Sequence, residues 1–514
     1  MVRVFVSLLV LLVATAGHGA PRKPGIDPPL LDRAIRGIVD RHKLVGLGIA
    51  VIESKKLRYI KGFGLRDRER KLPVTPDTLF SLGSTTKAFT AMLLGMLVDD
   101  GKLAWNKPVR HYLPRFALMD RFASERITPL DLLLHNSGLP RHDLVWYGSK
   151  ETREQLVRRL KYLPPTADFR QRFQYNNLMY MLAGYLAGKV AGSSWETLIR
   201  TRILQPLGMT RSCVTHREAM RDANHAEPYS GLSKAGVRKH LPFRDTGAVA
   251  PAGSLHISTN EMVRWLQFLI ARGKVGPRRL VKLGTLRRLA TPGMLVPSPN
   301  PSPIRAIRGS ISLLGYAPGW LVMSYRGQRV YFHGGAIDGF RAMVAVLPDP
   351  GHAIVIFTNS GGMAGRALSQ LLYMVLDQLH GGEPLPWEAH FEASRKHTEK
   401  QLAKLRARVA NFKGLPNTKP THPLEAYVGR YQNPGYGEIR VARKGSDLEL
   451  VYHEMHFGLR HVHYNRFRLV SDNPMLRYNI FTVTFRIDEK GKIGSFDAPL
   501  IPPPVKPLRF VRRG

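Results

Sequence analysis

Apolar and polar positions alternate along the chain with a period that changes, and each period predicts a different element. A helical period over residues 30–42 predicts a helix. Two apolar runs, 47–52 and 57–64, lie on either side of a short polar turn and predict a β-hairpin. Over 84–101 the period is helical again, and Gly101 stands where a helix C-terminus favours glycine.

Strand-like runs return after a long middle segment, about 105–290, in which helical periods are interrupted by Pro and Gly loops. The runs are 328–332, 341–347 and 352–358, and a helical period over 365–379 follows them. Because strands occur near both ends of this part of the chain, we expect them to share one sheet with a helical lobe inserted between them. The predicted class is α+β.

The pattern changes again after residue 382. Residues 383–422 are bounded by prolines and contain a strongly basic candidate helix at 394–412, so we interpret this stretch as a linker. Residues 423–514 contain short alternating runs that predict a small all-β accessory domain. These runs are 438–441, 448–452, 466–470, 478–487 and 493–496.

The first 20 residues have the pattern of a secretory signal peptide. Arg3 provides a short positive region, an apolar run of roughly 14 residues follows, and small residues suited to cleavage close the segment. The run is shorter than the ~20 residues that span a bilayer. We therefore expect a secreted protein, extracellular or periplasmic, with no transmembrane segment in the mature chain.

Composition adds one feature that the pattern does not show, which is a strong excess of positive charge. The 514 residues include 77 Lys and Arg against 38 Asp and Glu, a formal net charge of +39. A field of that sign favours acidic partners, and for an exported protein we expect an acidic polysaccharide or an acidic matrix polymer. The export signal and the lack of a recognition motif argue against nucleic acid.

Cysteine usage limits the candidate chemistry. The one cysteine, Cys213, excludes an intramolecular disulfide and every metal or cluster motif that needs several cysteines. We interpret Cys213 as a small, partly buried apolar residue. No metal and no cofactor are expected.

The first candidate for chemistry is the S-x-x-K motif at 84–87, which opens the helical period. Positions i and i+3 share a helix face, so the Lys87 amine can lie over the Ser84 hydroxyl. A serine needs such a base to become a nucleophile, and the free N–H groups of a helix N-terminus favour developing negative charge. By itself, the motif is more typical of a helix-capping serine followed by a solvated lysine.

A second motif, Y-x-N, has Tyr175 and Asn177 just before an apolar helical stretch. A tyrosine oxygen near a lysine ammonium can be held as phenolate and act as a general base, and the asparagine amide can donate to a substrate carbonyl. A second Y-x-N, at 431–433, lacks the following helix, and we interpret it as a turn.

The third motif is His333-Gly334-Gly335, followed by Ala336, between two strand-like runs. Glycines here let the backbone approach a ligand closely. A strand N–H beside the nucleophile would complete an oxyanion hole with the N–H of Ser84. Alone, the motif also fits a glycine-rich hairpin.

The three motifs occur in one order, each on the element type that its role requires. With them the chain resembles the serine β-lactamase-like family, the group of class C β-lactamases, DD-peptidases and esterases. The resemblance covers residues 28–382, and the tail at 427–431 resembles the small β domain often appended to such proteins. Further segments that match are 80–83, 128–133, 135–139, 251–255 and 316–320.

This resemblance implies an antiparallel sheet flanked by helices, with an inserted helical lobe, followed by a small all-β domain. It also implies a serine hydrolase that acts through an acyl-enzyme on an ester or amide, with a small acyl or peptide-like substrate. The resemblance thus implies that Ser84 attacks the carbonyl and that Lys87 and Tyr175 transfer the proton of its hydroxyl.

The remaining site residues would bind the substrate. Asn177 would orient the acyl group, the N–H groups of Ser84 and Ala336, beside Gly335, would hold the oxyanion, and His333 would contact the leaving side or a carboxylate. Position 333 is His where β-lactamases usually have Lys, which favours esterase or peptidase action. Position 176 is Asn where the family often has Ser, which puts the shape of the pocket in doubt.

The charge of +39 motivates an alternative function. In this second hypothesis the chain is a strongly basic extracellular matrix or binding protein on the same scaffold, which associates with acidic polymers while its activity is incidental or lost.

Overall fold

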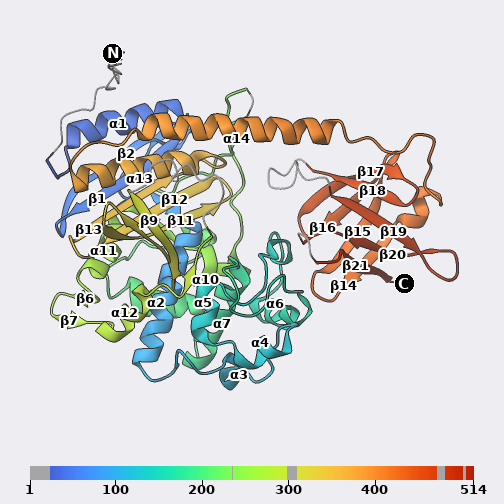
Figure 1. The fold of residues 1–514 in the computed structure, drawn as a ribbon, viewed down its shortest axis with the longest axis horizontal. Helices are drawn as coiled ribbons and strands as arrows, with labels where there is room; N and C mark the ends of the chain where they lie inside the picture. Colours follow the sequence, from blue (N-terminus) through green and yellow to red (C-terminus); the bar gives the residue numbers. More distant parts are fainter. Residues whose placement is uncertain (1–22, 234, 298–309, 472–480, 502–504, 514) are drawn as a thin grey trace, which may run out of the picture.

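The computed structural model describes residues 23–233, 235–297, 310–471, 481–501 and 505–513. The signal-peptide pattern and residues 478–480 of one predicted strand lie outside these residues. Figure 1 shows a larger body and a smaller barrel, with the long helix α14 (Trp387–Ala410) running from the first towards the second.

The larger body is built on a nine-stranded sheet. The predicted sharing of this sheet is confirmed, because β1 pairs antiparallel with β2 on one side, Leu47 opposite Phe63, and with β13 on the other, Leu47 opposite Thr358. In spatial order the strands are β3 (Leu72–Pro73), β2 (Lys56–Asp67), β1 (Gly46–Glu53), β13 (His352–Thr358), β12 (Phe340–Leu347), β11 (Gln328–Ile337), β10 (Trp320–Tyr325), β9 (Ile311–Ala317) and β8 (Met294–Leu295).

Both faces of the sheet are covered by helices, as the apolar runs of the central strands require. Leu47 and Ile49 of β1 pack into the core under α1 (Pro28–Arg41) and α13 (Ala364–His380), whereas Ala50 and Ile52 belong to the core of the opposite face. The predicted helix at the N-terminus is confirmed, and Asp27 caps it by accepting from the backbone N–H of Leu30.

The inserted helical lobe covers the second face and is confirmed over the predicted middle segment (Figure 1). Its entry helix α2 (Thr86–Asp99) has Asp100 as its C-cap, and Gly101 follows with φ +73°, as predicted. The other helices are α3 (Val109–Tyr112), α4 (Arg121–Arg126), α5 (Pro129–Leu134), α6 (Arg153–Arg159), α7 (Asn177–Ala191), α8 (Trp195–Ile199), α9 (His216–Ala219), α10 (Ala250–Gly253), α11 (Thr259–Ile270) and α12 (Leu283–Ala290).

The C-terminal part forms a closed barrel of antiparallel strands, which confirms an all-β domain. Pairing of β14 with β21, Arg430 opposite Arg513, closes it. The strands are β14 (Gly429–Asn433), β15 (Gly437–Lys444), β16 (Asp447–Tyr452), β17 (Met455–His463), β18 (Arg466–Val470), β19 (Thr482–Ile487), β20 (Ile493–Ala498) and β21 (Leu508–Arg513).

The second Y-x-N motif lies on strand β14, so its interpretation as a turn is wrong. The side chain of Tyr431 is fully buried in the barrel, and its hydroxyl donates to the carbonyl oxygen of Tyr427. The strand forms there because Tyr431 pairs with Ile439 of β15 and contributes to the barrel core.

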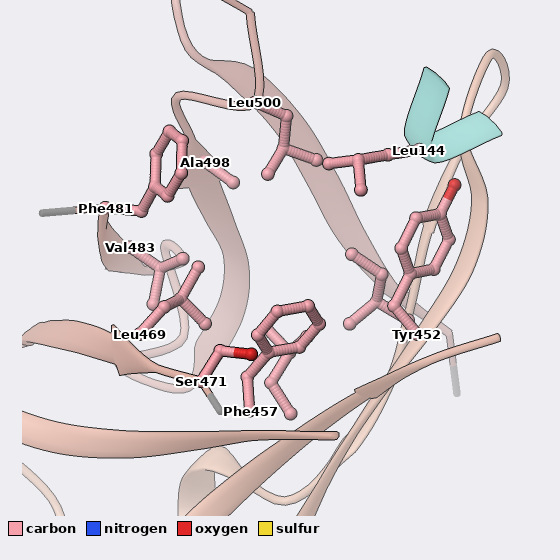
Figure 2. A pocket seen from close by; sticks show the side chains of 11 residues that line it. Leu144, Tyr452, Phe457, Leu469, Ser471, Phe481, Val483, Ala498 and Leu500 are labelled. Carbon is pink, nitrogen blue, oxygen red and sulfur yellow. The ribbon is translucent and has the colours of Figure 1, made fainter. Parts of the chain in front are cut away.

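Side chains fill the inside of the barrel. One mouth of the barrel retains a cavity of about 30 Å³, the volume of a single water molecule. Figure 2 shows apolar side chains from several strands around it, together with Leu144 of the helical lobe. Over the described residues, no helix combines the length and the apolar character that a membrane crossing demands.

Candidate active site

Ser84 lies on a tight turn that is pressed against strand β11. It belongs to the 3₁₀-helix η1 (Gly83–Thr85), which leads from β4 (Leu79–Ser81) into α2. Gly83 has φ +51°, and a Cβ at this position would lie 2.7 Å from the backbone nitrogen of Ala336. A Cβ on Gly335 would lie 1.9 Å from the carbonyl oxygen of Leu82. Glycine at both positions allows the turn and the strand to meet.

This contact brings Gly335 and Ala336 beside the turn that carries Ser84, although more than 240 residues separate them in sequence. Ser84 lies in the 3₁₀ turn two residues before the first residue of α2, close to the N–H groups that a helix N-terminus leaves free. The turn that carries Ser84 and the backbone of Ala336 are therefore neighbours, and an oxyanion hole formed by the N–H groups of these two residues stays a prediction.

Three oxygen atoms surround the Lys87 amine. Its Nζ lies 2.8 Å from Asn177 Oδ1, 2.8 Å from the carbonyl oxygen of Ala252 and 3.1 Å from Ser84 Oγ. The first two oxygens can only accept, so each takes one N–H of the amine. A neutral amine has one lone pair left, and this lone pair then faces the Ser84 hydroxyl.

Burial favours this neutral form of Lys87. The side chain is completely buried, and the loss of water around it holds its pKa well below the ordinary value of 10.5. The nearby charge of Arg141 lowers the pKa further, while the carboxylate of Asp143 opposes the shift. The amine can therefore accept the proton of Ser84.

Tyr175 is the second group that contacts the nucleophile. Its hydroxyl is hydrogen bonded to Ser84, and Lys87 Nζ lies 4.9 Å from the centre of its ring. Burial raises the pKa of Tyr175 above its ordinary value of 10, and the bond to Ser84 opposes this only in part. These surroundings favour a neutral phenol over the phenolate expected from the sequence, because a neutral Lys87 supplies no ammonium. The phenol is placed to relay a proton.

The two asparagines of the second motif have separate tasks. Asn177 is the first residue of α7, and its amide oxygen holds Lys87 while its Nδ2 donates to Asp143 Oδ1 at 3.0 Å. Asn176 is buried and caps the same helix, because its Oδ1 accepts from the backbone N–H of Met179 at 3.2 Å. The asparagine at position 176, where the family often has serine, thus stabilises the N-terminus of α7, and its side chain does not line the pocket.

His333 lies in the wall of the site, but both nitrogens of its ring already have hydrogen-bond partners. Its Nδ1–H donates to the carbonyl oxygen of Gly334 at 2.7 Å, and its Nε2 accepts from the hydroxyl of Tyr316 at 3.2 Å. Burial lowers the pKa of His333 to about 3, so the ring is neutral. In this neutral form His333 has no N–H left for a substrate carboxylate, so the predicted contact with a carboxylate would require the ring to gain a second proton.

A second neutral histidine stands behind the catalytic groups. His135 ends α5 in the left-handed conformation, and its Nδ1 accepts from the backbone N–H of Asn176 at 3.1 Å. Its ring packs against Tyr175, with 4.3 Å between the ring centres, and against Tyr316, with 4.8 Å. Burial holds the pKa of His135 well below 6.5. The wall carries no charge, so it excludes water and strengthens the polar contacts around Ser84.

Sequence reasoning missed three groups that contact the site. The carbonyl oxygen of Ala252, on the short helix α10, accepts from Lys87, although its segment was recognised only as a flanking match. Asp143 holds Asn177, and the guanidinium of Arg141 lies 5.0 Å from the centre of the Tyr175 ring. Both come from a loop with no period and no motif, so no signal in a single sequence distinguishes them.

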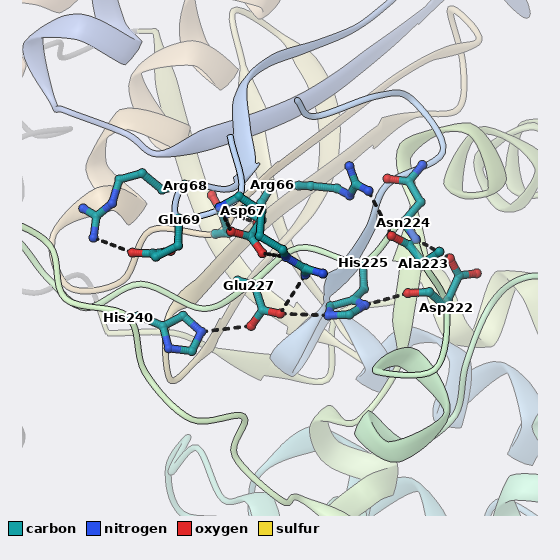
Figure 3. A network of polar contacts seen from close by, with 12 residues as sticks. Arg66, Asp67, Arg68, Glu69, Asp222, Ala223, Asn224, His225, Glu227 and His240 are labelled. Atoms are coloured by element: carbon teal, nitrogen blue, oxygen red, sulfur yellow. Dashed lines mark hydrogen bonds and ion pairs between the residues drawn. The ribbon is translucent and has the colours of Figure 1, made fainter. Parts of the chain in front are cut away.

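A separate polar cluster joins the end of β2 to the loop before residue 240 (Figure 3). Glu227 accepts from His225 at 3.0 Å and from His240 at 2.9 Å, and it pairs with Arg70 at 3.6 Å. These groups satisfy one another, so the cluster ties loops together. Among the described residues, no three His, Cys, Asp or Glu side chains are placed to hold a metal ion.

Cys213 fits the interpretation as a small, partly buried residue. It is half-buried, and its thiol donates to the carbonyl oxygen of Arg211. Burial raises the pKa of the thiol to about 12, which keeps it protonated and unreactive.

Models of known families match most of the chain. A family model described as "Beta-lactamase" matches residues 31–377, and one described as "Domain of unknown function (DUF3471)" matches residues 415–510. Among related proteins, an unguisins hydrolase of Aspergillus campestris is 28% identical over 425 residues, which cover 79% of this chain and 76% of the relative. The protein flp of Staphylococcus aureus is 24% identical over 339 residues, which cover 64% of this chain and 62% of the flp chain.

Solved structures share the fold. An octameric penicillin-binding protein homologue from Pyrococcus abyssi superposes with a TM-score of 0.62 at 22% identity, over 95% of this chain and 100% of the other. The D-amino acid amidase of Ochrobactrum anthropi superposes with a TM-score of 0.56 at 23% identity, over 68% of this chain and 99% of the amidase.

Proposed function

Because this chain belongs to the beta-lactamase family and is a serine hydrolase, we propose that it cleaves an amide bond in a small peptide-like substrate through an acyl-enzyme on Ser84. One observation carries the proposal: the buried Lys87 amine lies 3.1 Å from Ser84 Oγ, while two oxygens that can only accept, Asn177 Oδ1 and the carbonyl oxygen of Ala252, each lie 2.8 Å from it.

The reaction follows from this geometry. Lys87 takes the hydroxyl proton as Ser84 Oγ bonds to the carbonyl carbon, and the N–H groups of Ser84 and Ala336 hold the oxygen that becomes negative. When the C–N bond breaks, the leaving amine receives a proton from the Lys87 ammonium through the Tyr175 hydroxyl. Water then attacks the acyl-Ser84 ester in the same way, which releases the acid and restores the free enzyme.

The amide substrate class is supported by the similar proteins. One is named a hydrolase of unguisins and one is a D-amino acid amidase, whereas the fold alone fits esters equally well. The neutral His333 also fits an uncharged substrate, because its ring offers no positive charge to a carboxylate.

The test compares matched amides and esters. We expect the purified chain to release amine from D-amino acid amides or short peptide amides, and mass spectrometry of the quenched reaction to find the acyl group on the peptide that contains Ser84. Hydrolysis of the esters without any turnover of the matched amides would contradict the amide proposal and favour an esterase.

Export from the cell is part of the proposal and rests on the pattern of residues 1–20. We expect the mature chain outside the cytoplasm, with an N-terminus after the small residues near position 20. N-terminal sequencing of the native protein tests this, and a retained Met1 would contradict it.

Binding to an acidic polymer is a second candidate function, supported by the surface of α14. Lys396, Lys400, Lys404 and Arg408 are exposed on this helix, which extends from the catalytic body towards the barrel (Figure 1). Arg395 differs from them because it already pairs with Glu392 and Glu399, both at 2.6 Å. An acidic chain could lie along the exposed bases while Ser84 acts elsewhere.

A further inference from the structure

The loop between α5 and α6 lies between the active site and the barrel, and successive residues of the loop face opposite ways. His142 and Leu144 contact the barrel, whereas Asp143 contacts the catalytic side chains. This alternation centres on the 3₁₀-helix η2 (Asp143–Val145). A displacement of the barrel would therefore act on Asp143 through its two immediate neighbours.

On the catalytic side, Asp143 is held by several donors. Its Oδ1 accepts from Asn177 Nδ2 at 3.0 Å and from the indole N–H of Trp146 at 2.8 Å, and its Oδ2 accepts from Arg141 at 2.6 Å. The other end of the Asn177 amide accepts from Lys87. Asp143 thus fixes which way the Asn177 amide points, and the amide in turn fixes the amine that faces Ser84.

On the barrel side, His142 is held by Tyr436. The ring Nε2–H donates to the carbonyl oxygen of Pro164 at 3.1 Å, so Nδ1 is the acceptor and takes the O–H of Tyr436 at 2.8 Å. Burial lowers the pKa of His142 to about 4, which keeps the ring in this neutral form. Tyr436 is itself fixed, because it is buried and its carbonyl oxygen accepts from Tyr452 at 2.7 Å.

Leu144 occupies the mouth of the barrel. It lines the cavity of about 30 Å³ together with barrel residues such as Tyr452 and Leu500, and Figure 2 shows the three side chains around the same opening. The leucine thus serves as a plug that joins the lobe to the barrel core.

A second set of contacts also connects this loop with the barrel. Tyr147, at the end of the same loop, donates to Asp338 Oδ2 at 2.6 Å, and Arg244 pairs with the same carboxylate at 3.0 Å. Arg244 also pairs with Glu454 of the barrel at 3.0 Å. Asp338 directly follows β11, the strand that carries Ala336, so the barrel contacts both walls of the site through neighbouring residues.

We propose that the barrel is a positioning element for catalysis: Tyr436 and the barrel mouth hold His142 and Leu144, and the loop thereby places Asp143 to align Asn177 and Lys87. Asp143 is a positioning residue, because it contacts the groups that act on Ser84 and not Ser84 itself. This inference rests on the proposed role of Ser84 as the nucleophile.

The test is the rate at which a fluorophosphonate labels Ser84 in the full-length chain. In this reaction Ser84 Oγ bonds to phosphorus and fluoride leaves. Tyr436→Phe removes only the hydroxyl that holds His142, and we expect about a tenfold lower maximal labelling rate with unchanged half-saturation. Tyr431→Phe is the matched control, because this barrel tyrosine donates only within the barrel, and we expect it to label like the wild type.

A second pair of variants tests the plug and guards against misfolding. Leu144→Asn should slow labelling, whereas Leu144→Met, which refills the barrel mouth, should restore it. If both Tyr436→Phe and Leu144→Asn fold and label at the wild-type rate, the inference is wrong; if Tyr436→Phe does not fold, the Leu144 pair decides alone. Lack of labelling in the wild-type chain would instead contradict the role of Ser84.

Discussion

Lys87 is the residue whose surroundings determine how Ser84 is activated. A lysine in water would be an ammonium and would have no lone pair for the serine proton. Complete burial and the charge of Arg141 lower the pKa of Lys87 and so favour the neutral amine. The same burial keeps Tyr175 protonated. Lys87 therefore accepts the serine proton, and the Tyr175 hydroxyl relays it.

The pH dependence of labelling should report this neutral amine. Below the pKa of Lys87 the ammonium cannot accept a proton, so the labelling rate should rise through that pKa and then stay constant. Because the pKa is well below 10.5, we expect the inflection well below 10.5, with no second change up to about pH 10, since the pKa of Tyr175 is raised.

Arg141→Gln provides the control for the pH dependence. Removing the positive charge that lowers the pKa of Lys87 should move the inflection to higher pH without abolishing the labelling. A labelling rate that still climbs at about pH 10 in the wild type would show that Lys87 is an ordinary ammonium and would overturn its role as the base.

At the scale of single residues, the sequence identified the site residues that belong to motifs and missed the site residues that belong to none. Ser84, Lys87 and Tyr175 are brought together as expected, because the spacing on a helix and the order of the motifs constrain them. The state of His333 was not predictable, since it depends on Tyr316, which lies on another strand. Asp143 was not predictable either, because a loop residue without a period carries no signal.

At the scale of elements, the contact between η1 and β11 places the nucleophile. The sequence predicted that these glycines let the backbone approach a ligand, whereas the atom close to Gly335 is the backbone oxygen of Leu82 in the turn that carries Ser84. Gly334 differs, because a Cβ at this position would meet its nearest atoms only at 3.8 Å. The two adjacent glycines of one strand therefore have different functions.

Alanine at these two positions tests the contact. Gly335→Ala puts a Cβ 1.9 Å from the oxygen of Leu82, so strand and turn must separate, and we expect labelling of Ser84 to fall by at least about 100-fold. Gly334→Ala introduces only ordinary contacts and should stay within about twofold of the wild type. Equal labelling rates for both variants, with both folded, would contradict the account of this contact.

The exposed bases of α14 provide a prediction for the second candidate function. Replacement of Lys396, Lys400, Lys404 and Arg408 by Gln should lower the salt concentration that elutes the protein from a sulfated column, while Ser84 labelling is unchanged. Arg395→Gln is the control and should have a smaller effect, because Arg395 is already paired. Unchanged elution of the fourfold variant would show that the +39 charge acts over the whole surface.

The main elements were predictable because periodic patterns reflect local geometry. The terminal strands of the sheet, the helical lobe and several barrel strands follow their apolar periods. Strand β14 was misread because Tyr431 is followed by Asn433 and Pro434, which are turn formers, although burial of the tyrosine holds the strand. Tertiary packing outweighed the local signal there.

At the scale of the whole molecule, the body and the barrel are joined both by the chain itself and by contacts between distant residues. The chain crosses through α14, whose buried residue is Trp387, stacked on Tyr373 with 4.4 Å between the rings. The loop around Asp143 joins them through contacts that are not part of the chain connection, namely His142 with Tyr436 and Leu144 with the barrel mouth. The sequence indicated the first connection as a linker and gave no sign of the second, because contacts between distant loops leave no periodic pattern.

Limited digestion with trypsin tests this division. We expect the first cleavage within 388–422, because α14 beyond Trp387 is exposed and rich in Lys and Arg. The helix α13 also contains an arginine, Arg366, but it packs against the sheet and should resist. First cleavage within α13 or the sheet would contradict the view of α14 as the least protected connection.

The measurement that tests the account most directly is covalent labelling of Ser84. The wild-type chain should react with a fluorophosphonate, and mass spectrometry should find the phosphonyl group on the peptide that contains Ser84. Ser84→Ala should abolish labelling while the fold and thermal stability are kept, and Lys87→Ala should slow it by roughly 10²–10⁴-fold. Labelling that persists in folded Ser84→Ala would contradict Ser84 as the nucleophile, and with it the proposed mechanism.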